Sequence, residues 1–196
     1  MKENKRAVWS WAFYDWANSA YSTTVMAGFF PLFFKEYWAD PNNPSQSTFY
    51  LGMANSIASM VVAALAPLLG SVADQGSIKK KFLTFFAFLG VIMTGGLWMV
   101  AQGNWQMAVL FYVIATIGFA SGNVFYDALL PGLASEERVD AVSSLGFGLG
   151  YLGGGLLFLV NVFMYLKPEI FGIPDGATAI KLSFLSVAVW WAVFTI

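Results

Sequence analysis

The sequence contains no cysteine and no histidine, and only 11% of its 196 residues are charged. Without cysteine the chain can form no disulfide and can use no thiol chemistry. Without histidine it lacks the commonest zinc ligand and the usual general base near neutral pH. We therefore expect no enzyme here, no metal and no other cofactor.

The low charge content also sets the class of protein. A soluble domain carries about 25% charged residues, whereas this chain is 58% hydrophobic. Its net charge of −1 gives no reason to expect a nucleic acid partner. Several apolar segments reach the length of about 20 residues that a helix needs to cross a bilayer. The composition therefore predicts a polytopic membrane protein whose surroundings are the lipid bilayer.

Six apolar segments, separated by polar or turn-rich loops, are predicted to be transmembrane helices. Pro31 is expected to bend or end the first of them, and Ser135 followed by two glutamates predicts the start of the fifth. The first segment is too long for a signal peptide and lacks a small-residue cleavage site, so we expect it to be retained. The last is still apolar at Ile196, so we expect the natural sequence to continue. The segments are residues 8–34, 48–72, 82–101, 106–130, 141–166 and 177–196.

Positive residues predict the orientation of these helices. An even number of spans places both ends of the chain on one side of the membrane, and lysine and arginine choose the side. The amino terminus and the second and fourth loops hold seven of the ten lysine and arginine residues. The amino terminus is therefore predicted to be cytoplasmic.

A polar stripe runs along the first apolar segment. At about 100° per residue, six residues fall on one side of a helix. Polar side chains cannot face acyl chains cheaply, so this stripe is expected to face protein or a water-filled cavity. Asp15 lies roughly 13 Å along the helix from Arg6, which is inside the hydrocarbon if Arg6 marks the headgroups. The six residues are Trp11, Asp15, Asn18, Ser19, Ser22 and Met26.

Two roles are open for Asp15. Its carboxylate can contact an amine of a solute or carry a proton, or it can be a buried group that hydrogen-bonds a neighbouring helix for packing alone. The functional role is favoured because amide and hydroxyl groups accompany it. The residues predicted for solute contact or coupling are Asp15, Asn18, Ser19, Ser22, Trp11, Tyr14 and Asn123.

Two further patterns concern helix packing. Residues 13–15 (Phe-Tyr-Asp) recur as residues 125–127 in the fourth segment, which predicts two three-helix repeats of the kind common in transporters. In the fifth segment, Gly146, Gly150 and Gly154 lie four residues apart. This spacing predicts a stripe where another helix packs closely.

Residues 70–81 (GSVADQGSIKKK) join the second and third segments. They resemble the signature of the major facilitator superfamily, although two uncharged residues precede the lysines and arginine is absent. Gly70 would allow close helix contact and Gly76 a tight turn. Asp74 can accept hydrogen bonds from a neighbouring helix N-terminus, where a carboxylate is favoured.

Residues 11–21 (WAFYDWANSAY) and 123–131 (NVFYDALLP) resemble signatures of the vacuole-effluxer-like branch of that superfamily. The branch includes autophagy-related vacuolar amino-acid exporters of fungi and many bacterial relatives. The resemblance covers the whole chain. It implies an all-α membrane protein that forms the six-helix, amino-terminal half of a twelve-helix transporter. The missing second half would be its partner.

The resemblance also implies a function. It implies secondary active transport of small organic solutes by alternating access, with amino-acid efflux as the known activity of fungal members. The membrane would be the cell membrane in a bacterium and the vacuolar membrane in a fungus. A cytoplasmic gate is implied in which Asp127 pairs with Lys79 or Lys80. The residues expected in this gate are Gly70, Asp74, Gly76, Lys79, Lys80 and Asp127.

Three observations keep alternatives open. Tyr151 stands where the related antiporter motif has proline, which weakens the case for proton antiport. A non-transporting membrane scaffold would have the same composition. An intramembrane aspartyl protease would need two aspartates that share a proton, and Asp15 and Asp127 are the candidates, but the Gly-x-Gly-Asp motif of that class is absent.

Overall fold

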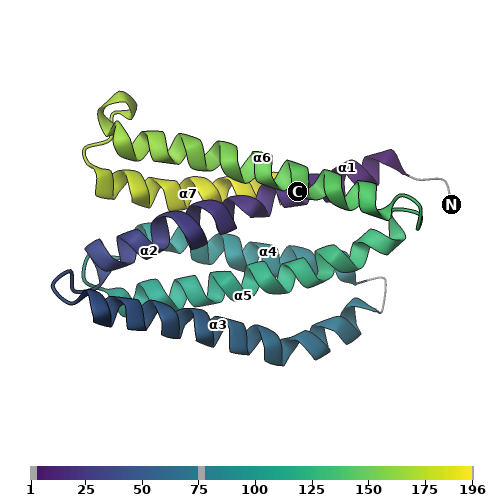
Figure 1. Ribbon diagram of the computed structural model, residues 1–196, viewed down its shortest axis with the longest axis horizontal. Coiled ribbons are helices and arrows are strands. Elements are labelled where there is room, and N and C mark those ends of the chain that lie inside the picture. The colour runs from purple at the N-terminus through teal and green to yellow at the C-terminus, as the bar shows by residue number, and fades with distance from the viewer. Residues whose placement is uncertain (1–3, 75–77, 196) are drawn as a thin grey trace.

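A computed structural model describes residues 4–74 and 78–195, and within these ranges the chain forms helices and no strand. The long helices run side by side along one axis (Figure 1). The first helical run is continuous and combines α1 (Lys5–Ala20), the π-helical segment η1 (Tyr21–Phe29), α2 (Phe30–Phe33) and a second π-helical segment, η2 (Phe34–Trp38). The remaining elements are α3 (Pro44–Ala73), α4 (Lys79–Gly96), η3 (Leu97–Met99), α5 (Trp105–Leu129), η4 (Leu130–Gly132), α6 (Val139–Leu166), η5 (Pro168–Phe171) and α7 (Gly176–Thr195).

Five helices of the described residues are long and apolar enough to cross a membrane. Their outward surfaces carry large apolar side chains, among them Phe85, Leu159 and Val193, each about 60% exposed or more. A bilayer would cover such surfaces. The five are Pro44–Ala73, Lys79–Met99, Trp105–Gly132, Val139–Leu166 and Gly176–Thr195.

Asparagine caps explain why several helices begin before their apolar segments. The side chain of Asn4 accepts hydrogen bonds from the backbone N–H groups of Arg6 and Ala7, and Asn43 and Asn104 cap α3 and α5 in the same way. Such caps satisfy backbone donors that the first turn of a helix leaves unpaired. The first helix therefore begins at Lys5 rather than at residue 8.

Two expected helix boundaries are wrong. The first helical run does not end at Pro31, because the proline lies in the first turn of α2, directly after η1. A π-helical turn shifts the hydrogen-bond pattern, so the missing proline N–H is accommodated without a break. Ser135 does not begin the fifth long helix. Its carbonyl accepts a turn hydrogen bond from the Arg138 N–H, at 2.9 Å, and α6 starts at Val139.

The glycines of α6 pack directly on α1, as their spacing predicted. A Cβ atom added at Gly146 would lie 2.7 Å from the Trp11 ring, and one at Gly150 would lie 2.6 Å from Asp15 Oδ2. At Gly154 it would lie 2.9 Å from the Ser19 carbonyl oxygen. At Gly154 the nearest atom belongs to the α1 backbone, so a larger residue there would push the two helices apart.

A second close contact joins α4 to α5. A Cβ atom at Gly118 would lie 2.8 Å from both the Gly90 nitrogen and the Phe86 carbonyl oxygen. Gly90 in turn leaves room for the Trp191 indole of α7, which is completely buried. Helices α4, α5 and α7 therefore pack through main chain and one large aromatic ring.

The repeated Phe-Tyr-Asp sequence has different surroundings at its two sites. Phe13 is exposed, whereas Phe125 is fully buried. The rings of Tyr14 and Tyr126 contact each other, with their centroids 5.2 Å apart. The two sequences are thus neighbours in space, and the three-helix repeat stays a prediction.

Most cationic residues lie at one end of the bundle, which we call the lysine-rich end. The starts of α1 and α4 and the connection from α5 to α6 lie there, whereas the connections from α4 to α5 and from α6 to α7 lie at the opposite end (Figure 1). Its cationic residues are Lys5, Arg6, Lys79, Lys80, Lys81 and Arg138.

The glycine contacts predict a stability difference between two substitutions. Gly118→Ala should lower the free energy of unfolding by about 1–3 kcal/mol, because its new methyl group meets backbone atoms that cannot move aside. Gly155→Ala is the control, since nothing lies within 4 Å of a Cβ atom there, and alanine favours a helix by up to about 1 kcal/mol. Thermal unfolding in detergent measures both. Equal melting temperatures for the two variants would contradict the packing described here.

Candidate functional site

Polar side chains of the first helical run open into a cavity of about 230 Å³, which we call the Asp15 cavity. Its walls come from α1, η1, α5 and α6. The polar lining residues are Asp15, Ser19, Ser22, Thr23 and Asn123. The others are Phe119, Phe147, Gly150 and Tyr151.

Asp15 is half-buried at this cavity. The Ser19 hydroxyl donates a hydrogen bond of 3.3 Å to its Oδ1 atom. The Oδ2 atom lies against Gly150 of α6, where the absence of a side chain leaves room for it. The carboxylate is therefore held between two helices and remains in contact with the cavity.

Asn18 supports the cavity from behind rather than lining it. It is 1% exposed, and its Nδ2 donates a hydrogen bond of 2.6 Å to Asn123 Oδ1. This bond ties α1 to α5 and orients the Asn123 amide, which does line the cavity. Buried amides that are paired in this way hold neighbouring helices in one arrangement.

The π-helical segment η1 supplies the far part of the lining. Ser22 and Thr23 both donate hydrogen bonds of 2.9 Å to the Ser19 carbonyl, and Thr23 also donates to the Gly154 carbonyl of α6 at 3.2 Å. π-Helical turns are frequent at functional sites. Thr23 was missed by the sequence prediction, although its four-residue spacing from Ser19 was the available signal.

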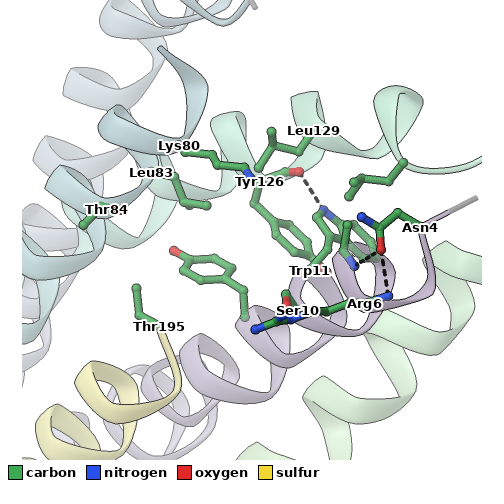
Figure 2. A pocket seen from close by; sticks show the side chains of 13 residues that line it. Asn4, Arg6, Ser10, Trp11, Lys80, Leu83, Thr84, Tyr126, Leu129 and Thr195 are labelled. Carbon is green, nitrogen blue, oxygen red and sulfur yellow. Dashed lines mark hydrogen bonds between the residues drawn. The ribbon is translucent and has the colours of Figure 1, made fainter. Parts of the chain in front are cut away.

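Trp11 and Tyr14 do not line the Asp15 cavity. Trp11 Nε1 donates a hydrogen bond of 2.9 Å to the Tyr126 carbonyl, and its ring stacks on Tyr126 at 4.3 Å. Both predicted residues lie at a second cavity, of about 340 Å³, at the lysine-rich end. We call it the terminal cavity (Figure 2). The predicted solute residues thus divide between two places.

The expected gate residues are also spread over several positions. Asp74 is exposed at the C-cap of α3. A Cβ atom at Gly70 would meet nothing within 4 Å among the described residues, so the close helix contact expected there stays a prediction. Gly76 lies outside the described residues.

Lys79 links the start of α4 to the end of α5. Its Nζ atom donates a hydrogen bond of 2.8 Å to the main-chain carbonyl of Ala128, next to the exposed Asp127. A cation is favoured at a helix C-terminus, where carbonyl groups are unpaired. Lys80 instead lines the terminal cavity.

The described residues show neither a metal site nor a paired-aspartate site. No cluster of three acidic side chains that could hold a metal ion occurs among them. Asp15 is half-buried and Asp127 exposed, and no hydrogen bond between their carboxyl groups occurs in the described parts. Two aspartates that share a proton would have to lie in contact.

Comparisons with known proteins assign this sequence to a family. The family described as "Vacuole effluxer Atg22 like" matches residues 41–196. The uncharacterized MFS-type transporter YxiO of Bacillus subtilis is 43% identical over 95% of this chain and 44% of its own length. Autophagy-related protein 22 of Pichia angusta is 24% identical over 84% of the chain and 32% of its own length.

The chain therefore spans less than half the length of these relatives. An uncharacterized protein of Aquifex aeolicus is 26% identical over 92% of the chain. No solved structure matches the chain. The family match and the YxiO relative, together with apolar helices of membrane-spanning length, show that this chain is an integral membrane protein of the Atg22-like vacuole effluxer family, within the major facilitator type of transporters.

Proposed function

We propose that the protein is a secondary active transporter of small organic solutes, with amino acids as the first candidates, and that it works by alternating access. The relatives carry transporter and vacuole-effluxer names. The observation that carries the proposal is the half-buried Asp15 carboxylate at a polar cavity between apolar helices.

The physical argument starts from the cost of a carboxylate among membrane helices. Such a group is tolerated where it faces water, a solute or a counter-charge. The ammonium group of an amino acid would supply that counter-charge to Asp15, while Ser22 and Asn123 offer hydrogen bonds to the rest of the solute. The cavity is smaller than the roughly 300–1,000 Å³ of a complete ligand pocket. This fits a half-site that a second, complementary half of the transporter completes.

In one state of the transport cycle the cavity would open at the lysine-rich end. We propose that this end faces the cytoplasm because positive residues prefer that side. We propose that the gate comprises Gly70, Asp74, Gly76, Lys79, Lys80 and Asp127. The Lys79 hydrogen bond to Ala128 supports a link between α4 and α5 at this end. The membrane would be the cell membrane of a bacterium or the vacuolar membrane of a fungus.

A non-transporting scaffold is the second candidate. It would use the same apolar helices but would have no need of the Asp15 cavity. Saturable binding of an amino acid to the full-length protein would contradict the scaffold, and its absence across an amino-acid panel would contradict the transporter.

Replacement of the carboxylate tests the solute site. Asp15→Asn should lower transport of the preferred solute by the full-length protein in liposomes about tenfold or more, because hydrogen bonds to a charged group contribute about 1.5–3 kcal/mol. Asp140→Asn removes an exposed carboxylate in the first turn of α6 and is the matched control. Wild-type transport by Asp15→Asn would reject the functional role of Asp15.

A smaller change at Gly150 tests the geometry of the same carboxylate. The methyl group of Gly150→Ala would meet the side-chain ends of Asp15 and Ser19, which can turn away, so folding should survive while solute affinity falls several-fold. Gly148→Ala is the control on the same helix, since its methyl group would meet nothing within 4 Å. Solute titrations and thermal unfolding separate the two effects. Unchanged affinity in Gly150→Ala would show that the Asp15 position is unimportant.

Charge reversal tests the proposed gate. Asp127→Lys should slow transport roughly tenfold by placing a third cation beside Lys79 and Lys80, since the charge-assisted hydrogen bond proposed for the gate, about 1.5 kcal/mol or more, could not form. Adding Lys79→Asp or Lys80→Asp should restore much of the rate. Lys81→Asp is the control partner, because Lys81 lies in the same lysine run but lines neither cavity. Failure of both rescues would exclude a charge pair at the gate.

A further inference from the structure

The terminal cavity differs in chemistry from the Asp15 cavity. Figure 2 shows Arg6 and Ser10 on α1 and Lys80 and Thr84 on α4 around one space, with Tyr126 and Leu129 of α5 beside them. The two cavities share no lining residue. The terminal cavity is therefore separate from the Asp15 cavity. Lys80 also belongs to the proposed gate, so the inference is tested by anion binding rather than by transport.

The charges around this space all have one sign. Among the residues that the structure describes, Arg6 and Lys80 are the charged ones at its lining, and none there is an aspartate or glutamate. Neither side-chain cation has an ion pair or hydrogen bond within the described residues. Two cations that line one cavity without an acidic neighbour among the described residues attract an anion.

The backbone adds to this positive field. The first turns of α1 and α4 both border the cavity, and neither turn contains an acidic residue. Ile78 at the N-cap of α4 has an apolar side chain that cannot accept a hydrogen bond. A helix N-terminus carries partial positive charge on its unpaired N–H groups. The start of α4 therefore favours negative charge beside Lys80, whereas Asn4 already caps two N–H groups of α1.

Part of the remaining wall is apolar. Leu83, Leu129 and Leu133 line the cavity together with the Trp11 ring. Trp9, which precedes Ser10 on α1, is 49% exposed. Tryptophan is enriched where membrane helices meet the interface with water. The site has cations at the end of a membrane helix bundle and leucines beside them. These features suit a molecule that carries a phosphate group on an apolar chain.

We propose that the terminal cavity binds a phosphate-group anion through Arg6 and Lys80. The phosphate can belong to the headgroup of an acidic phospholipid or be free in solution, because the cations recognise the same group in both. Ser10 and Thr84 supply hydroxyl donors beside the cations. Binding would join the start of α1 to the start of α4.

The test uses the full-length protein and two charge-matched double variants. One combines Arg6→Gln with Lys80→Gln. The control combines Lys5→Gln with Lys81→Gln, which removes the same charge from the same end of the bundle at residues that do not line the cavity. In the first arm, native mass spectrometry measures binding of phosphatidylglycerol against phosphatidylcholine. In the second, inorganic phosphate is titrated against chloride at equal ionic strength in lipid-free detergent, with melting temperature as the readout.

Arg6→Gln with Lys80→Gln should weaken anion binding roughly 25-fold, since each cation that contacts the bound group contributes about a fivefold effect. The control pair, whose cations do not line the cavity, should weaken it less than about twofold. If the first double variant loses only its selective binding of phosphatidylglycerol, the site holds a lipid headgroup. If it loses the effect of phosphate on the melting temperature, the site holds a free anion. Arg6→Lys with Lys80→Arg should retain binding and the wild-type melting temperature. Equal weakening by both double variants, or no dependence on either anion, would overturn the proposal.

Discussion

The close contact between α1 and α6 is the constraint on which the rest of the structure depends. At Gly146, Gly150 and Gly154 the α6 backbone comes so near that a single Cβ atom would collide with α1. The polar stripe of the first helix is therefore covered on one side by main chain, and Asp15 keeps a defined position between Ser19 and Gly150. Small residues let helices approach closely where no hydrophobic force drives them together, as is the case inside a bilayer.

The other helices hold this pair in place by different means. The buried Asn18 amide donates a hydrogen bond to Asn123 of α5, and the Thr23 hydroxyl of η1 donates one to the Gly154 carbonyl of α6. Away from this pair, α5 packs on the α4 backbone at Gly118, and the Trp191 ring of α7 packs on α4 at Gly90. The polar contacts thus position the Asp15 cavity, while glycine and aromatic contacts make the frame around it.

The two cavities have opposite electrostatic character. The Asp15 cavity offers a carboxylate, whereas the terminal cavity offers two cations and the start of α4. Trp11 and Tyr126 stack at the terminal cavity, and a Cβ atom at Gly146 would lie 2.7 Å from both of them. Under the two proposals, a zwitterionic or cationic solute would suit the first cavity and an anion the second.

The sequence by itself determined the helical segments, the polar stripe at Asp15 and the glycine stripe of α6, because each depends on local length, hydrophobicity or helical spacing. Only the tertiary structure decided that Trp11 and Tyr14 belong to the terminal cavity and that Lys79 reaches the Ala128 carbonyl rather than a carboxylate in the described residues. It also decided that the first helix continues past Pro31. These outcomes depend on the hydrogen-bond register of the π-helical segments and on which helices become neighbours. The 3.6-residue period of a single segment predicts neither the register nor the neighbours.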